Sequence, residues 1–394
     1  MALKFVDELE LKDKKIICRF DFNVPLKDGK ITDSTRIDNA LPTIKYIAEQ
    51  GARKIILMSH LGRPKGEVKP EFSLEPVAEY LAQQLGKDVI LTESAIDSGI
   101  NNLLNLPETK FVLLQNLRYH PEEKKGDKEF AEKLSSYADI YINDAFGAAH
   151  RKHASTYTIN AFFDKNHRAA GFLLKRELEN LNKVVKEPSR PLMAIVGGAK
   201  VSDKIGTIES LLINAQELFI GGAMAYPFLK AQGHTVGKSL CSDEDVELAK
   251  KILKEDRGGK LNLPCDHIIS DSPDGAPENC DSIDIPEGKM GLDVGAKTIA
   301  AYDEKLKNAK TVLWNGPLGL FENENYAKGT MSIAETLANL DAFTLVGGGD
   351  SVSAVKKSGK AEKFSHISTG GGASLEYIEK GELPGVKALN FGVE

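Results

Sequence analysis

Residues Lys14–Phe22 read KKIICRFDF, an apolar run with β-branched residues that ends in charged and polar ones. Such a run favours a buried strand. Similar runs follow at Lys54–Ser59, Lys110–Gln115 and Asp139–Asn143, and the segments Thr35–Gly51 and Ser73–Gly86 between them have the apolar spacing of helices. Because strands alternate with helices, the first half of the chain predicts a parallel sheet with helices on both faces.

The second half of the chain repeats this alternation. Its strand candidates are Pro191–Val196, Glu217–Ile220, Thr311–Trp314 and Ala342–Val346, and its helix candidates are Ser202–Leu212 and Glu244–Lys254. A chain of 394 residues is also too long for one domain with a single hydrophobic core, so its length predicts more than one domain.

The two halves meet at a polar, helix-like stretch, Glu177–Lys186, which ends at Pro188–Pro191, where prolines cannot continue a helix. The sequence therefore predicts an α/β protein with two doubly wound, Rossmann-like parallel-sheet domains joined by a helical hinge. We expect the domains at residues 1–172 and 191–379, with the interdomain helix and hinge at 173–190.

The overall composition limits the class of partner. The net charge of −6 argues against nucleic acid or an anionic membrane as a partner. No apolar run approaches the roughly 20 residues that span a bilayer, and Asp7 stands where a signal peptide would be apolar. The four cysteines show no metal-ligand spacing, and so few cysteines in a long chain are typical of a reducing compartment. We expect a cytoplasmic protein.

Charged and polar residues follow each strand of the first half. The carboxyl ends of parallel strands meet at one edge of the sheet, where ligands bind. A single arginine is more often a solvated surface residue, but four that gather at one edge would form a cationic site suited to phosphate and carboxylate oxygens. The residues at these strand ends are Asp21, Asn23, Arg36, His60, Arg63, Arg118, His120, His150 and Arg151.

Glycines follow the strands of the second half, at Gly197–Gly198, Gly221–Gly222, Gly347–Gly349 and Gly370–Gly372. One pair indicates only a tight turn, whereas four allow the backbone to approach an anion closely. Neither GxxxxGK[ST] nor GxGxxG occurs, so the Walker and dinucleotide fingerprints are absent.

Three charged residues stand beside these glycines. Lys200 and Lys204, at i and i+4 near a helix start, are expected on one helix face, as phosphate contacts or as a solvated surface. Asp350 is a candidate Mg²⁺ ligand, a helix N-cap, or both.

Five motifs together resemble the phosphoglycerate kinase family, in its order and over nearly the whole chain. They are Arg19–Pro25 (RFDFNVP), His60–Pro64 (HLGRP), Gly197–Lys204 (GGAKVSDK), Trp314–Pro317 (WNGP) and Gly347–Ser351 (GGGDS). The family often has Thr in place of Ala148 and can have Thr in place of Ser351, and neither departure removes an expected ligand contact.

The resemblance implies a site for each substrate. It implies that 3-phosphoglycerate is held by Asp21, Asn23, Arg36, His60, Leu61, Gly62, Arg63, Arg118 and Arg151. It implies that the nucleotide is held by Lys200, Lys204, Gly221, Gly222, Gly291, Leu292, Asn315, Glu322, Gly348, Gly349, Asp350 and Ser351. Of these, Glu322 would meet the ribose, and Gly221, Gly222, Gly291 and Leu292 would flank the adenine. The resemblance also implies a tail, residues 380–394, that packs on the N-terminal domain.

The implied reaction is reversible, Mg²⁺-dependent phosphoryl transfer between 1,3-bisphosphoglycerate and ADP, giving 3-phosphoglycerate and ATP, in glycolysis and gluconeogenesis. A carboxylate with a pKa near 4 needs no general base. We therefore expect Arg36 and Lys200 as catalytic residues that neutralise charge, with Asp350 as the metal ligand and hinge closure in a monomer. The alternatives are a nucleotide-dependent oxidoreductase, which lacks its glycine fingerprint here, and a two-lobed anion-binding protein, which leaves Lys200, Lys204 and Asp350 unexplained.

Overall fold

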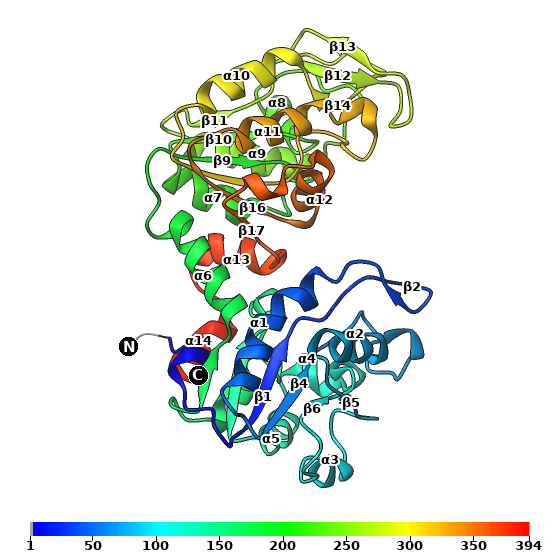
Figure 1. The fold of residues 1–394 in the computed structure, drawn as a ribbon. Helices are drawn as coiled ribbons and strands as arrows, with labels where there is room; N and C mark the ends of the chain where they lie inside the picture. Colours follow the sequence, from blue (N-terminus) through cyan, green and yellow to red (C-terminus); the bar gives the residue numbers. More distant parts are fainter. Residues whose placement is uncertain (1–2, 394) are drawn as a thin grey trace. The chain divides into compact units, whose positions relative to one another are not determined.

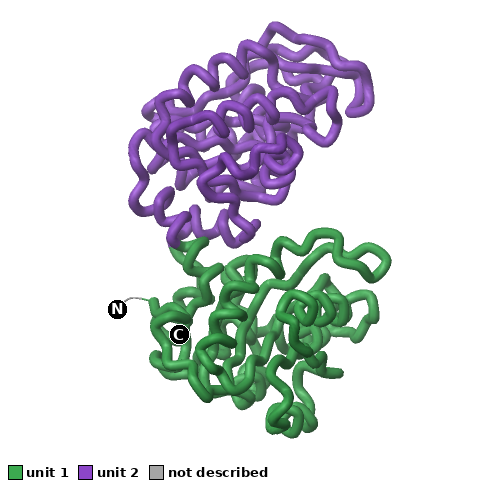
Figure 2. The backbone as a smooth tube through the Cα atoms, viewed as in Figure 1, with its two compact units in different colours: residues 1–178, 382–394 green, residues 179–381 purple. Residues whose placement is uncertain are grey.

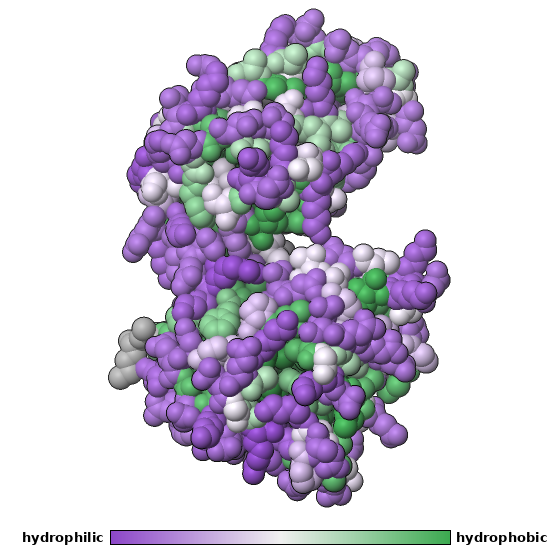
Figure 3. Space-filling view, viewed as in Figure 1, coloured by the Kyte–Doolittle hydropathy of each residue, from purple (hydrophilic) through white to green (hydrophobic). Residues whose placement is uncertain are grey.

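The computed structural model describes residues 3–393 and divides into two compact units. Unit 1 comprises Met1–Leu178 and Glu382–Glu394, and unit 2 comprises Glu179–Gly381 (Figure 2). Helix α6 (Phe172–Val185) begins in unit 1 and continues into unit 2. Hydrophilic residues cover most of the face of each unit in Figure 3. Within the described residues, no helix is long and apolar enough to cross a bilayer.

Unit 1 is built on a six-stranded sheet in the order β5-β6-β4-β1-β7-β8, and every neighbouring pair is parallel (Figure 1). The strands β1, β4, β6 and β7 are almost wholly buried, as expected for a sheet with helices on both faces. The strands are β1 (Lys15–Phe20), β4 (Lys54–Met58), β5 (Val89–Leu91), β6 (Phe111–Leu113), β7 (Ile140–Asp144) and β8 (Arg168–Ala170).

Amphipathic helices bury their apolar sides against this sheet, and Ile37, Ile44 and Ile47 of α1 join Ile16, Cys18 and Ile55 in the core. The helices are α1 (Thr35–Glu49), α2 (Glu75–Leu85), α3 (Gly99–Leu103), α4 (Pro121–Lys125), α5 (Lys128–Ser135) and α14 (Pro384–Phe391). A short hairpin, β2 (Leu26–Lys27) and β3 (Lys30–Ile31), precedes α1.

The C-terminal helix α14 belongs to unit 1, although it follows unit 2 in sequence. Arg168 Nε on β8 donates to the Leu389 carbonyl at 2.9 Å, and the Gly385 amide donates to the Ala149 carbonyl at 2.8 Å. These bonds attach the end of the chain to the first sheet.

Unit 2 contains a second parallel sheet of six strands, in the order β11-β10-β9-β15-β16-β17. Its strands are β9 (Leu192–Val196), β10 (Glu217–Ile220), β11 (Leu261–Asn262), β15 (Thr311–Asn315), β16 (Phe343–Gly347) and β17 (His366–Ile367). The helices of unit 2 are α7 (Ile205–Asn214), α8 (Ala225–Ala231), α9 (Asp243–Glu255), α10 (Ala296–Leu306), α11 (Lys328–Ala338), α12 (Gly349–Ser358) and α13 (Gly372–Lys380). Trp314, fully buried on β15, packs against Phe364 in the core.

The two parallel α/β sheets confirm the predicted fold class. The strand bounds differ from prediction by at most two residues at either end, because the apolar runs that predict them are the buried residues themselves. The sequence analysis missed an antiparallel sheet, β13-β12-β14, formed by β12 (His267–Ser270), β13 (Glu278–Cys280) and β14 (Met290–Val294). Glu278 and Asn279 are exposed, so β13 carries no apolar pattern.

Candidate active site

The strand-end residues of unit 1 gather at the carboxyl edge of the first sheet. Arg36, at the start of α1, forms an ion pair with Asp21 after β1, with Nη1 and Oδ2 3.0 Å apart. The Asn23 amide oxygen accepts from the Gly62 amide at 2.8 Å, so the loops after β1 and β4 are bonded together. Arg118, after β6, donates to the Gly62 carbonyl at 2.7 Å.

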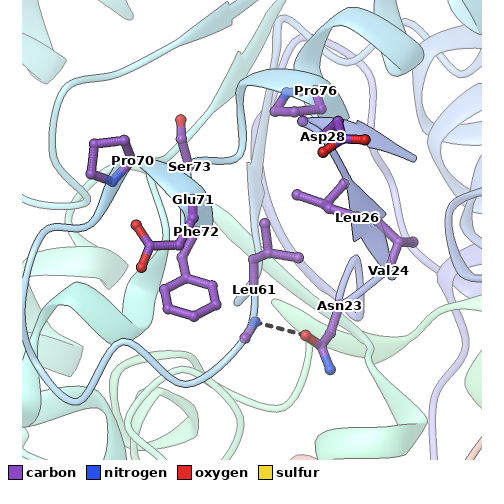
Figure 4. A pocket seen from close by; sticks show the side chains of 12 residues that line it. Asn23, Val24, Leu26, Asp28, Leu61, Pro70, Glu71, Phe72, Ser73 and Pro76 are labelled. Carbon is purple, nitrogen blue, oxygen red and sulfur yellow. Dashed lines mark hydrogen bonds between the residues drawn. The ribbon is translucent and has the colours of Figure 1, made fainter. Parts of the chain in front are cut away.

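Gly62 is the point where these three loops meet. Its φ is +61°, and a β-carbon there would lie 2.3 Å from the Phe72 ring, so no other residue fits without a shift. Figure 4 shows the Gly62–Asn23 bond beside a pocket of about 460 Å³ that Leu61, Phe72 and the β2–β3 hairpin line. Leu61 is buried, whereas Gly62 is only partly covered.

Arg118 carries an unused donor at this edge. Its Nε is buried and has no partner among residues 3–393. Burial, with Arg19 and Arg151 nearby, lowers the pKa of Arg118 to about 10, which still leaves it charged at neutral pH. An anion would relieve both the unpaired donor and the crowding of positive charge.

His60 lies deeper, only 5% exposed, and its Nδ1 is 3.0 Å from Arg19 Nη2. Burial, and after it the charges of Arg19, Arg118, Arg36 and His153, hold its pKa well below the usual value. His60 is therefore neutral at physiological pH.

The other two arginines of the set are exposed. Arg63 follows Gly62 directly in the chain, and Arg151 lies after β7 with its Nε 3.0 Å from His150 Nε2. Both side chains are accessible to a ligand in solution.

The sequence analysis missed several buried residues that hold this edge together. Asn116 bonds to the Leu61 amide and carbonyl and to the Arg118 amide at 2.7–3.2 Å. Glu123 bonds to Ser155, and Ser155 accepts from Arg19 Nε. Arg19 stands inside the quoted motif RFDFNVP, which is the only signal the sequence offered for any of them.

In unit 2, two adjoining pockets lie beyond the carboxyl ends of β9, β10, β15 and β16, and Asp350 lines both. The larger, about 470 Å³, has apolar walls from residues such as Leu240, Met290 and Pro317. The smaller, about 210 Å³, is lined mainly by glycines and polar residues. Predicted residues Gly222, Gly291, Leu292 and Glu322 line the larger pocket, and Lys204, Asn315, Gly348, Gly349 and Ser351 line the smaller one.

The glycines permit a dense crossing of backbone at these strand ends. A β-carbon on Gly222, where φ is +68°, would lie 2.7 Å from Gly198 N. Gly221 has a packing role, because a β-carbon there would lie 2.2 Å from the Leu318 side chain. Gly371 and Gly372 also line the smaller pocket. The sequence analysis noted the Gly370–Gly372 cluster but assigned no ligand contact to these glycines.

Asn315 and Lys204 are two polar side chains of the smaller pocket whose surroundings suit an anionic ligand. Asn315 is 1% exposed, yet neither its amide nitrogen nor its amide oxygen has a partner among residues 3–393. Lys204 Nζ donates to the carbonyls of Gly197 and Asn315 at 2.6 and 3.1 Å. Burial lowers the pKa of Lys204 to about 8, against the opposing effect of Asp350 and Asp203.

Two expectations about this site are wrong. Lys200 and Lys204 do not share a helix face, because α7 begins only at Ile205 and Lys204 closes a turn with Val201. The Ser202 amide is drawn to Asp245 Oδ1 at 2.9 Å, which leaves Lys200 exposed on a loop.

Asp350 is not the N-cap of α12. α12 begins at Gly349, so Gly348 is its N-cap, and the φ of +88° at Gly348 is one that glycine adopts readily. Asp350 is exposed in the first helical turn. No group of three potential metal-ligating side chains occurs in the described part of the chain. A single carboxylate beside an anion site fits Mg²⁺ that arrives with phosphate oxygens.

Fold and site together define a two-unit α/β protein with a cationic site in one unit and a glycine-lined site in the other. The family model described as phosphoglycerate kinase matches residues 6–381. A phosphoglycerate kinase of Clostridium novyi is 50% identical over 394 residues, covering 98% of each chain, and one of Borrelia hermsii is 48% identical, covering 99% of this chain and all of that one.

Solved structures agree. Phosphoglycerate kinase from Coxiella burnetii has a TM-score of 0.88 at 37% identity and covers 98% of each chain. The Pyrococcus horikoshii enzyme has a TM-score of 0.83 at 29% identity and covers 99% of each chain. The chain belongs to the phosphoglycerate kinase family. It is an enzyme, a phosphotransferase whose reaction links 1,3-bisphosphoglycerate and ADP to 3-phosphoglycerate and ATP.

Proposed function

We propose that unit 1 holds 3-phosphoglycerate, that unit 2 holds the magnesium complex of the nucleotide, and that transfer between them is direct. The observation that carries this division is the pair of unpartnered atoms on the buried Asn315 amide, beside glycines in a pocket fit for phosphate oxygens. Buried polar atoms nearly always have partners, so a ligand is expected there. In unit 1 the unpaired Arg118 Nε makes the same argument for an anion.

The acid substrate would be bound through its carboxylate, hydroxyl and phosphate groups. We assign this binding to Asp21, Asn23, Arg36, His60, Leu61, Gly62, Arg63, Arg118 and Arg151. Arginine forks suit the phosphate and carboxylate oxygens, while Asp21 and Asn23 can accept from the hydroxyl.

The nucleotide would lie across both pockets of unit 2. We assign the base to the apolar larger pocket with Gly222, Gly291 and Leu292, and the ribose to Glu322. Gly221 does not line this pocket, and we assign it a supporting role through its close packing on Leu318. We assign the binding of the phosphates to Lys200, Lys204, Asn315, Gly348, Gly349 and Ser351. Asp350 would hold Mg²⁺, which when bound with the nucleotide supplies charge neutralisation at the phosphates.

In the direction from ATP, a carboxylate oxygen of 3-phosphoglycerate attacks the γ-phosphorus. The bond from this phosphorus to the bridging oxygen breaks, and its electron pair stays on ADP. The carboxylate is ionised at pH 7, so no base takes part. Arg36 and Lys200 neutralise the charge of the moving group, and catalysis is mainly positioning and electrostatic stabilisation.

We also propose that residues 173–190 act as a hinge, because the two ligands are assigned to different units and in-line transfer needs contact within about 3–3.5 Å. Only both ligands together would favour the closed state. A single globule of this length would have a radius of gyration of roughly 21 Å. In solution X-ray scattering we expect the free protein to exceed this value and to contract most with both ligands. Full contraction with one ligand would refute the hinge mechanism.

The test of the activity itself is ATP formation from 1,3-bisphosphoglycerate and ADP, measured through a coupled assay. A control with NADH in place of ADP tests the oxidoreductase alternative, and binding of both anions without turnover would favour a binding protein. We further propose a cytoplasmic monomer, in keeping with four free cysteines. Sedimentation would test the monomer.

A further inference from the structure

A continuous chain of polar groups lies buried behind the cationic site of unit 1. Glu123 in α4 is fully buried and accepts from the Ser155 hydroxyl at 2.6 Å and from the Ser155 amide at 3.0 Å. The Ser155 hydroxyl oxygen in turn accepts from Arg19 Nε at 2.8 Å. Arg19 Nη2 then lies 3.0 Å from His60 Nδ1. Four residues, each following a different strand or lying in it, are linked in this way.

Arg19 does not itself face a ligand. It is 1% exposed on β1, and its Nε, Nη1 and Nη2 are directed to Ser155, the Phe20 carbonyl and His60. Its positive charge is matched by the Glu123 carboxylate at the far end of the Ser155 bridge. A buried cation with this arrangement orients its neighbours.

The direction of each hydrogen bond determines the state of His60. A guanidinium has only donors, so His60 Nδ1 must accept from Arg19 and cannot carry a proton. A second candidate partner, Asp21 Oδ1, is 3.9 Å from Nδ1, beyond hydrogen-bond distance. In the neutral ring the proton therefore sits on Nε2, which has no partner within residues 3–393. This nitrogen is a free donor.

We propose that Arg19, Ser155 and Glu123 are positioning residues that hold His60 as the Nε2–H tautomer, so that it offers a neutral hydrogen-bond donor to an oxygen of the acid substrate. This inference rests on the proposed assignment of 3-phosphoglycerate to unit 1. The carboxylate and phosphate oxygens of the substrate can only accept a hydrogen bond, so the opposite tautomer would present a bare nitrogen to them. The burial that lowers the pKa of His60 keeps the ring neutral and the tautomer defined.

The same groups connect the loops that carry Arg118 and Arg151. Glu123 follows Arg118 by one short turn, and Ser155 follows Arg151 in the next loop. The Ala154 amide also donates to the Glu123 carbonyl at 2.9 Å. Loss of the bridge should therefore weaken substrate binding without removing any group that touches the substrate.

The experiment uses the full chain labelled with ¹⁵N-histidine. The variant His60→Gln identifies the His60 signals among the eight histidines. In the ligand-free protein we expect a protonated Nε2 and a bare Nδ1, whose ¹⁵N signals are widely separated. In Arg19→Met we expect a mixture of tautomers, because Nδ1–H can then turn toward Asp21. The KM for 3-phosphoglycerate should rise roughly tenfold, the value of one hydrogen bond, while kcat stays within about twofold.

Glu123→Gln and Ser155→Ala are milder variants for the case that Arg19→Met does not fold, and each should raise the same KM. Glu122→Gln, one residue away, is the matched control and should change neither the His60 signals nor the KM for 3-phosphoglycerate. A proton on Nδ1 in the wild type, or an unchanged tautomer in a folded Arg19→Met, would overturn the inference. A wild-type KM in His60→Gln would instead overturn the substrate role of His60, whichever tautomer the spectrum reports.

Discussion

The cationic site of unit 1 and the glycine-lined site of unit 2 are suited to anions by opposite means. In unit 1 the groups that face the ligand are long charged side chains, fixed from behind by buried polar residues such as Asn116 and Glu123. In unit 2 the backbone itself is exposed at glycines, and at some of them, such as Gly222, a side chain would not fit. The comparison teaches that the cationic site of unit 1 depends on the charged side chains it contains, whereas the site of unit 2 depends on glycines, whose lack of a side chain lets a ligand reach the backbone.

This difference decides how each site should fail. Removing a charge from unit 1 takes away stabilisation while the surrounding backbone stays in place. Adding even a methyl group to unit 2 can obstruct the ligand. The predictions below test this contrast, beginning with the largest effect.

Arg36→Ala should lower kcat by about 100-fold or more, because one preorganised charge contact made in the transition state is lost. The KM for ATP should stay nearly unchanged, since the nucleotide is assigned to the other unit. Steady-state kinetics with both substrates varied would measure this. Arg53→Ala is the matched control, an exposed arginine just before β4, at the opposite edge of the same sheet. A kcat within about threefold of wild type would remove Arg36 from the mechanism.

Asp350→Asn should raise the Mg²⁺ concentration needed for half-maximal rate by more than about tenfold, because the single carboxylate ligand is lost. Its cost in stability should be small, on the order of 0.3–1 kcal/mol, since Asp350 is exposed in the first turn of α12 and is not its N-cap. Magnesium titrations of activity and thermal melts measure the two quantities. Asp341→Asn, exposed before β16, is the control, and equal magnesium curves would leave Asp350 without a metal role.

Gly349→Ala separates a ligand effect from a folding effect. A β-carbon on Gly349 would meet nothing within 4 Å and the residue does not need a positive φ, so the fold tolerates alanine. Alanine in a helix should even stabilise by up to about 1 kcal/mol. If the phosphates approach this backbone, the KM for the nucleotide should nevertheless rise roughly tenfold. Gly258→Ala, in an exposed loop, is the control, and an unchanged KM in Gly349→Ala would move the phosphates elsewhere.

The sequence predicted most of the parallel framework and the strand-end positions of the charged residues of unit 1. Strands such as β9 and β10 are short apolar runs followed by glycines, and both features are visible without coordinates. Arginines at strand ends are informative because the topology of a parallel sheet determines where they gather.

The parts that could not be predicted depend on contacts between distant residues. Arg19 and Ser155 are 136 positions apart, and no periodicity links them. Lys200 appeared helical from its spacing, but a side chain from α9, Asp245, holds the turn before α7 open. Asp350 was a candidate N-cap because a sequence of three consecutive glycines does not show which of them takes the positive φ and begins the helix, and in the structure it is Gly348.

The smallest expected effect concerns Lys204, a partly buried charged side chain that lines the smaller pocket of unit 2. Its pKa of about 8 arises because burial removes water from the ammonium form, although the carbonyls of Gly197 and Asn315 accept hydrogen bonds from it. The ammonium is the form that attracts a phosphate, so nucleotide affinity should fall as pH rises through this value. From pH 7 to pH 8.5 the protonated fraction drops about fourfold, and the KM for ATP should rise by the same factor.

The free energy of unfolding should increase as pH rises over this range, whereas nucleotide affinity decreases. The unfolded chain keeps this proton to a pH near 10.4, whereas the folded chain releases it near 8. Between these values the unfolded state binds more protons, so the contribution of Lys204 to stability rises with pH. If the KM for ATP rises between pH 7 and pH 8.5 while the protein remains as stable, alkaline unfolding cannot explain the weaker nucleotide binding. Lys204→Arg, charged throughout, should flatten the KM profile even if its affinity is lower, and a profile that kept its slope would assign the titration to another group.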